Sequence, residues 1–393
     1  MFKNSTSPIV ADFGGGSVKL LQITDGDTPA IVAAHVLEIP DEARGSLDRR
    51  FAFFAEELPN ILRRGGFHGR RVICSPASHH FIVQQTRIDP ESPLSADDQV
   101  RAEVAGRMEC LPASVVARSF PVPSSTRDRV ALAVAREDVM RHVDLFRQNR
   151  YEVVDVQPDQ IPMLRAFDHI HRRTEDQNVV TMYVDAGWGS TKVAVARGTD
   201  MVFARMIHVG GRQFDEVAAA HWGCTTADAR RRRTKEENVA VPTPTPSDSI
   251  DRGPAMLRAG IAKADRSATE RQVAVDRRTG VGCQSLDSVE GGSVESELHE
   301  IQDSVADELL MCSRFAQAVV GEPIDRMVMV GGEAHSRRFA GHLAQRIGVK
   351  SSVGDPIRRL LAATPEGAGT LDCGKEHPEW TVACGLCTIG LQV

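Results

Sequence analysis

Two segments far apart in this sequence share one pattern, and that pattern limits the folds that the chain can adopt. Residues Val10–Lys19 read VADFGGGSVK, and residues Val184–Lys192 read VDAGWGSTK. In each, an apolar run that predicts a strand ends in an aspartate, and glycines and a hydroxyl-bearing residue follow. Glycines let backbone N–H groups approach phosphate oxygens and tolerate positive φ, so the repeat predicts duplicated hairpins that wrap phosphates. Either hairpin alone would also fit an ordinary tight turn.

A third glycine motif, Val328–Glu333 (VMVGGE), follows the predicted strand 326–330 and leads into a predicted helix. Two adjacent glycines permit adenine and ribose to approach the backbone, and a helix N-terminus favours phosphate nearby. Taken alone, this motif would also fit a plain strand-to-helix turn. The three motifs together predict a nucleotide-binding cleft, and neither a P-loop nor a Rossmann fingerprint accompanies them.

The expected contacts to the nucleotide come from these three motifs. They are Gly14, Gly15, Gly16, Ser17, Lys19, Gly187, Gly189, Ser190, Thr191, Gly331, Gly332 and Glu333. Asp12 and Asp185 end two predicted strands and would repel phosphate on their own, so we expect these carboxylates to hold Mg²⁺ through bound water. The predicted cofactors are therefore ATP and magnesium.

The order and wide separation of the three motifs resemble the phosphate-1, phosphate-2 and adenosine motifs of the actin, Hsp70 and sugar-kinase superfamily. Within it, the chain resembles the PilM family of type IV pilus assembly proteins, which is related to the division protein FtsA. Four further stretches carry this resemblance, at residues 72–78, 98–112, 151–158 and 208–215. It spans nearly the whole chain except for one insertion.

The resemblance implies an α/β, actin-like two-lobed fold with duplicated βββαβα halves and an inserted small αβ subdomain. Residues 1–172 would form the first lobe, including the small subdomain at 79–150, and residues 173–393 would form the second. A length of 393 residues is sufficient for two cores. Proline, serine and charged residues indicate a largely flexible insertion at 237–292, within which residues 253–265 could form a helix.

Local patterns place several helices. Apolar residues at helical spacing predict a core-facing helix over 47–64, and a similar stripe predicts another over 294–315. Ser95 and Asp98 form a capping-box pattern at the start of a third helix. Gly223 is a natural helix C-cap, and Thr225 can cap the helix that follows it.

Two site residues outside the motifs follow from the resemblance. Relatives carry a basic residue beside the nucleotide on the helix after the second hairpin, and Arg231, within the run Arg230–Arg233, is its expected counterpart. The same run fits a solvated helix face, or a contact with acidic lipid or protein. Hydrolysis in the superfamily requires an oriented water, for which Asp12, Asp185 and Glu103 are the predicted catalytic residues.

One residue departs from the family pattern. Lys192 stands where FtsA-like relatives often have an acidic residue. Contacts to metal or phosphate at this position could therefore differ from those of relatives.

Composition bounds the partners and the location. A net charge of −6, from 47 basic and 53 acidic residues, indicates no general attraction to nucleic acid. No stretch approaches the ~20 apolar residues of a membrane helix, and the N-terminus lacks a leader pattern. We expect a cytoplasmic protein that reaches the inner membrane only through its partners.

The cysteines predict no disulfide framework, because the eight of them show no repeating spacing. Only Cys384 and Cys387 have the spacing of metal ligands. They lie in an apolar segment, so we interpret them as core residues rather than zinc ligands, for which Cys373 and His377 would be the remaining candidates.

The leading hypothesis is an ATP-binding scaffold of the type IV pilus assembly platform at the inner membrane. By resemblance, the small subdomain helps to form a groove for the N-terminal cytoplasmic tail of a PilN-like membrane protein. Other pilus assembly proteins and self-association are further expected partners, and catalysis would be a slow ATPase activity at most. Two alternatives stay open: a small-molecule kinase of the superfamily, for which no separate base is evident, and an FtsA-like filament-forming division protein, whose C-terminal membrane helix is not evident before Val393.

Overall fold

The computed structural model describes residues 5–77, 80–123, 125–170, 174–237, 293–364, 371–372 and 374–392. The insertion expected at 237–292, including the helix expected at 253–265, lies outside these residues except for Glu237. Cys373 also lies outside them, so the expected zinc alternative is not described.

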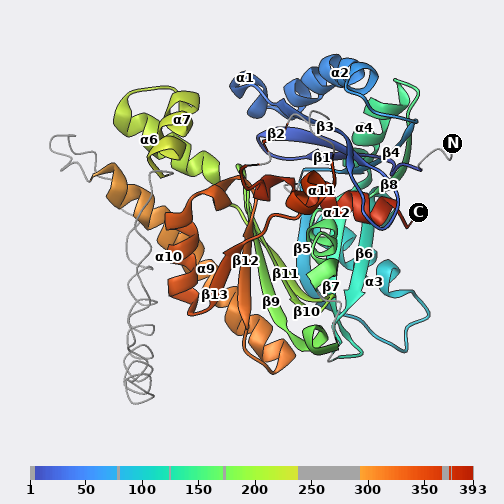
Figure 1. The fold of residues 1–393 in the computed structure, drawn as a ribbon. Coiled ribbons are helices and arrows are strands. Elements are labelled where there is room, and N and C mark those ends of the chain that lie inside the picture. The colour runs from blue at the N-terminus through green and yellow to red at the C-terminus, as the bar shows by residue number, and fades with distance from the viewer. Residues whose placement is uncertain are drawn as a thin grey trace, which may run out of the picture. The chain divides into compact units, whose positions relative to one another are not determined.

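Two five-stranded sheets organise the described chain, and they share one topology (Figure 1). The first sheet has the order β3-β2-β1-β4-β8 and the second the order β11-β10-β9-β12-β13. In each, three consecutive strands form an antiparallel meander, and two later strands add in parallel beside the first. This duplication is the one that the sequence repeat predicts.

The strands of the two sheets have the following bounds. The first contains β1 (Ile9–Phe13), β2 (Ser17–Ile23), β3 (Ile31–Glu38), β4 (Arg71–Ser75) and β8 (Glu152–Val156). The second contains β9 (Val180–Ala186), β10 (Thr191–Arg197), β11 (Asp200–Ile207), β12 (Arg326–Val330) and β13 (Lys350–Val353). Every residue of β1 and β9 is buried, as expected for central strands that are covered on both faces.

The helices occupy the connections. They are α1 (Asp41–Arg44), α2 (Leu47–Arg64), α3 (Ala96–Arg107), α4 (Arg136–Arg147), α5 (Gln160–Arg165), α6 (Gly211–Trp222), α7 (Thr226–Glu237), α9 (Val294–Val320), α10 (Arg337–Ile347), α11 (Ile357–Ala363) and α12 (Thr381–Gly390). Across the described ranges, none of them combines the length and the apolarity needed to cross a bilayer.

The predicted helix boundaries are confirmed where capping chemistry sets them. Ser95 Oγ accepts a hydrogen bond from Asp98 N at 3.1 Å and so begins α3. Gly223 ends α6 with φ of +60°, a conformation that glycine adopts without steric cost. Thr225 Oγ1 accepts from Asp228 N at 3.1 Å and caps α7.

The small subdomain is a three-stranded sheet of β5 (Phe81–Arg87), β7 (Asp128–Ala135) and β6 (Val115–Pro121), in that order. The side chains of its central strand, β7, point alternately into two hydrophobic cores. Ala131 and Ala133 pack beneath α3, whereas Val130 and Leu132 join the core of the second lobe. The sheet also contacts β11. The subdomain is inserted in the first lobe but therefore packs against the second lobe.

The C-terminal segment crosses between the lobes, which differs from the expected division at residue 172. Helix α12 contacts α5 and strands β1, β2 and β4 of the first lobe, and α11 contacts β3. Cys384 and Cys387 are buried in this helix, and burial raises the pKa of the Cys387 thiol to about 12. Their interpretation as core residues is confirmed.

Candidate functional site

The two predicted hairpins face one another across a cavity of about 570 Å³. This volume lies within the ~300–1,000 Å³ that small-molecule sites usually have. The predicted residues that line it are Asp12, Gly14, Gly15, Gly16, Ser17, Lys19, Asp185, Gly187, Gly189, Ser190, Gly331, Gly332 and Glu333. The three glycine motifs, which are distant in sequence, therefore meet at one site.

Three predicted residues do not line the cavity. Thr191 is buried, and its hydroxyl donates to Val209 O at 2.8 Å, which makes it a support of the second hairpin. Glu103 accepts hydrogen bonds from Thr86 and Arg107 within the small subdomain and does not line the cavity, so its expected role in orienting water stays a prediction without support from its position. Arg231 pairs with Asp228 on its own helix, and its side chain is 70% exposed and outside the cavity lining.

Gly331 is required by the close approach of β12 to β9. Its φ is +86°, and a Cβ there would overlap the carboxylate of Asp185 and lie 2.6 Å from Ala186 O. A short 3₁₀ turn, Gly332–His335, follows, and α10 begins only at Arg337. The helix N-terminus expected directly after the glycines is therefore displaced along the chain.

Trp188, on the second hairpin, lines the cavity and lies against Gly15 and Gly16 of the first hairpin. A Cβ on Gly15 would lie 3.3 Å from the Trp188 ring and 3.1 Å from Gly189 N, so any side chain there would be crowded by the second hairpin. A guanidinium group from each lobe packs against this ring, with Arg44 Cζ 4.9 Å and Arg230 Cζ 5.6 Å from the ring centroid. Such distances are typical of cation–π contacts.

Each of these three side chains has a buried donor for which the described residues provide no acceptor. They are Arg44 Nε, Arg230 Nη2 and Trp188 Nε1. Burial and the neighbouring charge of Arg230 lower the pKa of Arg44. Buried donors without acceptors are costly, and two guanidinium groups this close repel one another. An anion bound at this point would relieve both costs.

Each hairpin also carries an aspartate–lysine pair directly across its two strands. Asp12 on β1 faces Lys19 on β2, and Asp185 on β9 faces Lys192 on β10. Lys19 Nζ lies 4.0 Å from Asp12 Oδ2, and Lys192 Nζ lies 2.6 Å from Asp185 Oδ2. Asp159, which immediately precedes α5, adds a third carboxylate 2.9 Å from Lys192 Nζ.

The electrostatics of this cluster follow from its burial. Burial raises the pKa of Asp12 to about 6, although Lys19 and Lys192 oppose the rise. Burial alone would lower the pKa of Lys192, but Asp159, Asp185 and Asp12 outweigh it and raise that pKa well above its usual range. Lys192 is therefore a permanent cation among three carboxylates.

The cluster leaves no place for a magnesium ion bound directly by Asp185 and Asp159, whereas the contact through bound water expected at Asp12 and Asp185 stays a prediction. Mg²⁺ requires an octahedral cage of oxygens at about 2.0–2.1 Å and usually retains several waters. The oxygens of Asp185 and Asp159 that such an ion would share already contact the Lys192 ammonium at 2.6 and 2.9 Å. The departure from the family pattern at Lys192 thus changes the chemistry of the site.

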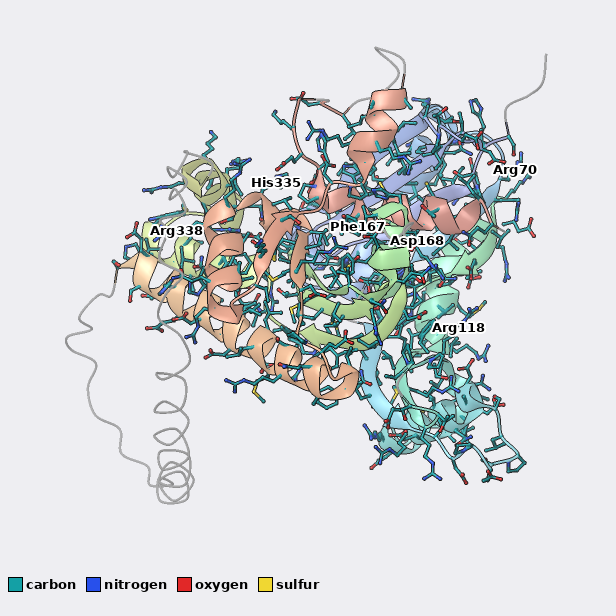
Figure 2. All side chains as sticks on the ribbon, turned by 60° about the horizontal axis from the view of Figure 1, so that its bottom comes forward. Arg70, Arg118, Phe167, Asp168, His335 and Arg338 are labelled. Atoms are coloured by element: carbon teal, nitrogen blue, oxygen red, sulfur yellow. The ribbon has the colours of Figure 1, made fainter. Side chains whose placement is uncertain are left out.

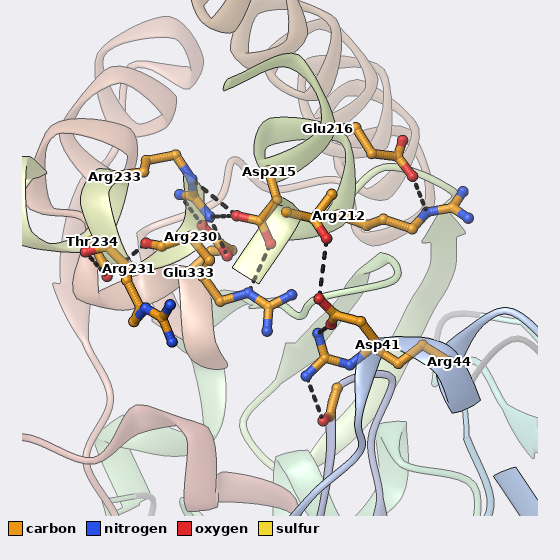
Figure 3. Close-up of polar contacts among 12 residues, drawn as sticks. Asp41, Arg44, Arg212, Asp215, Glu216, Arg230, Arg231, Arg233, Thr234 and Glu333 are labelled. Carbon is orange, nitrogen blue, oxygen red and sulfur yellow. Dashed lines mark hydrogen bonds and ion pairs between the residues drawn. The ribbon is translucent and has the colours of Figure 1, made fainter. Parts of the chain in front are cut away.

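Two arginines of α7 enter the site region where only Arg231 was expected. Figure 3 shows Arg230 and Arg233 directed toward Asp215, with Arg233 also reaching Glu333. Arg230 Nε lies 2.8 Å from Asp215 Oδ2, and Arg233 Nη1 lies 2.7 Å from Glu333 Oε2. The Arg233 side chain is only 4% exposed, so this network ties α7 to the third glycine motif.

The site and the fold can be compared with known proteins. No family model matches the chain. A chain from the PilM–PilN type IV pilus biogenesis complex aligns over 99% of this chain and 99% of its own length, with a TM-score of 0.71 and 17% sequence identity. This chain has the PilM fold. It is an actin-like fold of two lobes, as the sequence predicts.

Looser likenesses involve other actin-like proteins. The ethanolamine utilization protein EutJ from Carboxydothermus hydrogenoformans gives a TM-score of 0.46 at 11% identity, covering 98% of this chain and 90% of that one. MreB5 of Spiroplasma citri, bound to AMPPNP, gives 0.44 at 10% identity, covering 92% and 95%. At these scores they bear on neither the site nor the ligand.

Proposed function

We propose that the chain is an ATP-binding, actin-like scaffold of a type IV pilus assembly platform, held at the cytoplasmic face of the inner membrane by its partners. The proposal that the chain binds a nucleotide rests mainly on the unpaired donors of Arg44, Trp188 and Arg230, which line the cavity. Fold likeness to a chain of the PilM–PilN complex supports the assembly part.

A polyphosphate fits the chemistry of the cavity. The glycine hairpins offer backbone N–H groups, and two lysines and four arginines from both lobes line the cavity and supply positive charge. Because Arg44 belongs to the first lobe and Arg230 to the second, an anion between them would favour the closed arrangement of the lobes. ATP would then shift the population that binds a partner by its differential affinity for the two states.

The carboxylates around the cavity give little support to the kinase alternative. Among the described lining residues, each carboxylate has a basic partner: Asp12 with Lys19, Glu38 with Arg44, Asp185 with Lys192, Glu333 with Arg233, and Glu379 with His335. A sugar kinase requires a carboxylate that can accept a proton from its substrate. Slow ATP turnover remains compatible with the proposal, although it is not required.

Nucleotide binding is tested by thermal unfolding in magnesium buffer. ATP at about a hundredfold over its dissociation constant should stabilise the chain by roughly 2.7 kcal/mol. The double variant Arg44→Met with Arg230→Met should lose this stabilisation, because the anion loses both guanidinium groups. Arg231→Met is the matched control, since that arginine pairs only with Asp228 on the surface. Absence of stabilisation in the wild type would refute nucleotide binding.

The small subdomain is the proposed surface for the N-terminal tail of a PilN-like protein. Leu94, Met108 and Leu111 are apolar and exposed at the two ends of α3, and Leu111 is 73% exposed. Leu94 precedes the helix, and Met108 and Leu111 follow it, so each end of α3 offers exposed apolar side chains to a partner. In Figure 2 Arg118, on β6 of this subdomain, and His335, beside the cavity, mark the two separate regions.

Tail binding is tested with the cytoplasmic N-terminal peptide of the PilN-like protein from the same organism. Leu111→Asp should weaken peptide binding at least about tenfold, as loss of one apolar anchor does at interfaces. Met311 is an apolar residue of α9 in the second lobe that is 57% exposed, and Met311→Asp should leave binding unchanged. Equal peptide affinity in the wild type and Leu111→Asp would place the tail elsewhere.

A further inference from the structure

The strongest unexplained feature is the matched pair of ammonium groups behind the two hairpins. Lys19 and Lys192 occupy the same place in the two duplicated sheets, each directly opposite the aspartate that ends the first strand of its meander. Both lysines are buried and both line the cavity. A buried lysine is uncommon, and two at equivalent positions on both walls of one cavity indicate a common role.

The two lysines have donors available in the direction of the cavity. An ammonium group carries three protons and no acceptor. Lys192 directs two of its contacts to Asp185 and Asp159, and Lys19 hydrogen-bonds Ser17 Oγ at 3.3 Å beside the first glycine hairpin. A third proton on Lys192 can meet an acceptor in the cavity while both of its aspartate contacts persist.

The charges of this group resemble those of a metal site in which ammonium groups replace the ion. Asp12, Asp159 and Asp185 are held by two fixed positive charges, the same total charge as one divalent cation. Unlike a metal ion, the lysines cannot exchange with solvent. Their charge is present whether or not magnesium accompanies the ligand, and no coordination shell has to be built when the ligand enters.

We propose that Lys19 and Lys192 are a built-in substitute for magnesium, so that the cleft binds the polyphosphate of a nucleoside triphosphate without requiring a divalent cation. This inference rests on the proposed nucleotide-binding function and specifies its cofactor requirement. The two ammonium groups offset two of the three aspartate charges, which would otherwise repel phosphate, and offer donors to the phosphate oxygens. Arg44 and Arg230 line the same cavity.

The test measures ATP affinity by calorimetry on the full chain, once with excess Mg²⁺ and once with EDTA. The wild type should bind ATP in EDTA within about threefold of its affinity in Mg²⁺. A threefold change in affinity is smaller than the change expected from the loss of one charge-assisted hydrogen bond. In EDTA, Lys192→Met should bind ATP at least about tenfold more weakly than the wild type, because one charge-assisted hydrogen bond is lost. Lys192→Arg keeps the charge and should keep the metal independence. Lys350→Met, at an exposed lysine of β13, is the matched control.

A second measurement needs no nucleotide. With Lys192 removed, the carboxylates of Asp185 and Asp159 can accept a cation, so Mg²⁺ should raise the melting temperature of Lys192→Met but not that of the wild type. If Lys192→Met does not fold, the double variant Lys192→Met with Asp159→Asn removes one of the buried charges and is measured instead.

The outcomes separate the inference from the function on which it rests. ATP binding by the wild type only when Mg²⁺ is present would overturn the inference and leave the proposed nucleotide function intact. No ATP binding under either condition would overturn both. Equal affinities of wild type and folded Lys192→Met in EDTA would also overturn it, because the ammonium group would then contribute nothing.

Discussion

Replacement of Arg233 by alanine should lower the free energy of unfolding by about 3 kcal/mol, the lower end of the range for a buried ion pair that loses one partner. Arg233 is 4% exposed, and it contacts Asp215 at 3.0 Å and Glu333 at 2.7 Å. Without it, Glu333 loses its guanidinium partner and Asp215 keeps only Arg230. Denaturant unfolding followed by circular dichroism measures the difference.

The matched control for this prediction is Arg231→Ala on the same helix. Arg231 is 70% exposed and pairs with Asp228 at the surface, so its removal should change stability by no more than about 0.5 kcal/mol. Adding Glu333→Gln to Arg233→Ala should restore part of the loss, because it removes a buried unpaired charge. If the two single variants were equally stable, the network would not connect α7 to the glycine motif at Glu333.

The misassigned arginine shows where sequence reasoning about this site reached its limit. Arg230–Arg233 is an unbroken basic run with no apolar periodicity of its own, so the buried face of the helix was not apparent. One signal was present: Ala229 is a small apolar residue four positions before Arg233, which puts both on one helix face. Ala229 is fully buried in the structure.

The hairpins and most elements could be predicted because their determinants are local. Strand 326–330 and helix 47–64 have the expected bounds, set by apolar periodicity and by a serine cap at Ser46. The pairing of Asp12 with Lys19, and of Asp185 with Lys192, also follows from a tight hairpin, which places these residues opposite one another. The third carboxylate, Asp159, comes from a separate element, and local sequence does not place it.

Glu103 illustrates the opposite case. A carboxylate on a helix near the expected cleft satisfied the chemistry of an oriented water, but the direction of that helix depends on how its subdomain packs. Val100 and Val104 pack α3 against the three-stranded sheet of the small subdomain. Glu103 pairs there with Arg107. Packing between elements, rather than propensity, decided the position of this residue.

The second large effect is expected at Gly385, where helix α12 crosses α5. A Cβ on Gly385 would overlap the carbonyl carbon and oxygen of Pro162 and would lie 2.8 Å from its Cα. These are backbone atoms of a buried helix, so no side-chain rotation can relieve the overlap, and the two helices would have to separate. Gly385→Ala should therefore cost about 3 kcal/mol or more, at the upper end of the range for overpacked cores.

Gly341 on α10 provides the control, because no atom lies near the position of its added methyl group. Gly341→Ala should stabilise the chain by about 0.5–1 kcal/mol, since alanine favours the helix and glycine loses more backbone entropy on folding. The same substitution is thus expected to have opposite signs at two helical glycines. Because α12 also packs on β1, which carries Asp12, Gly385→Ala should weaken ATP binding as well, whereas Gly341→Ala should not. Wild-type stability and ATP affinity in Gly385→Ala would mean that α12 does not cross α5 at this glycine.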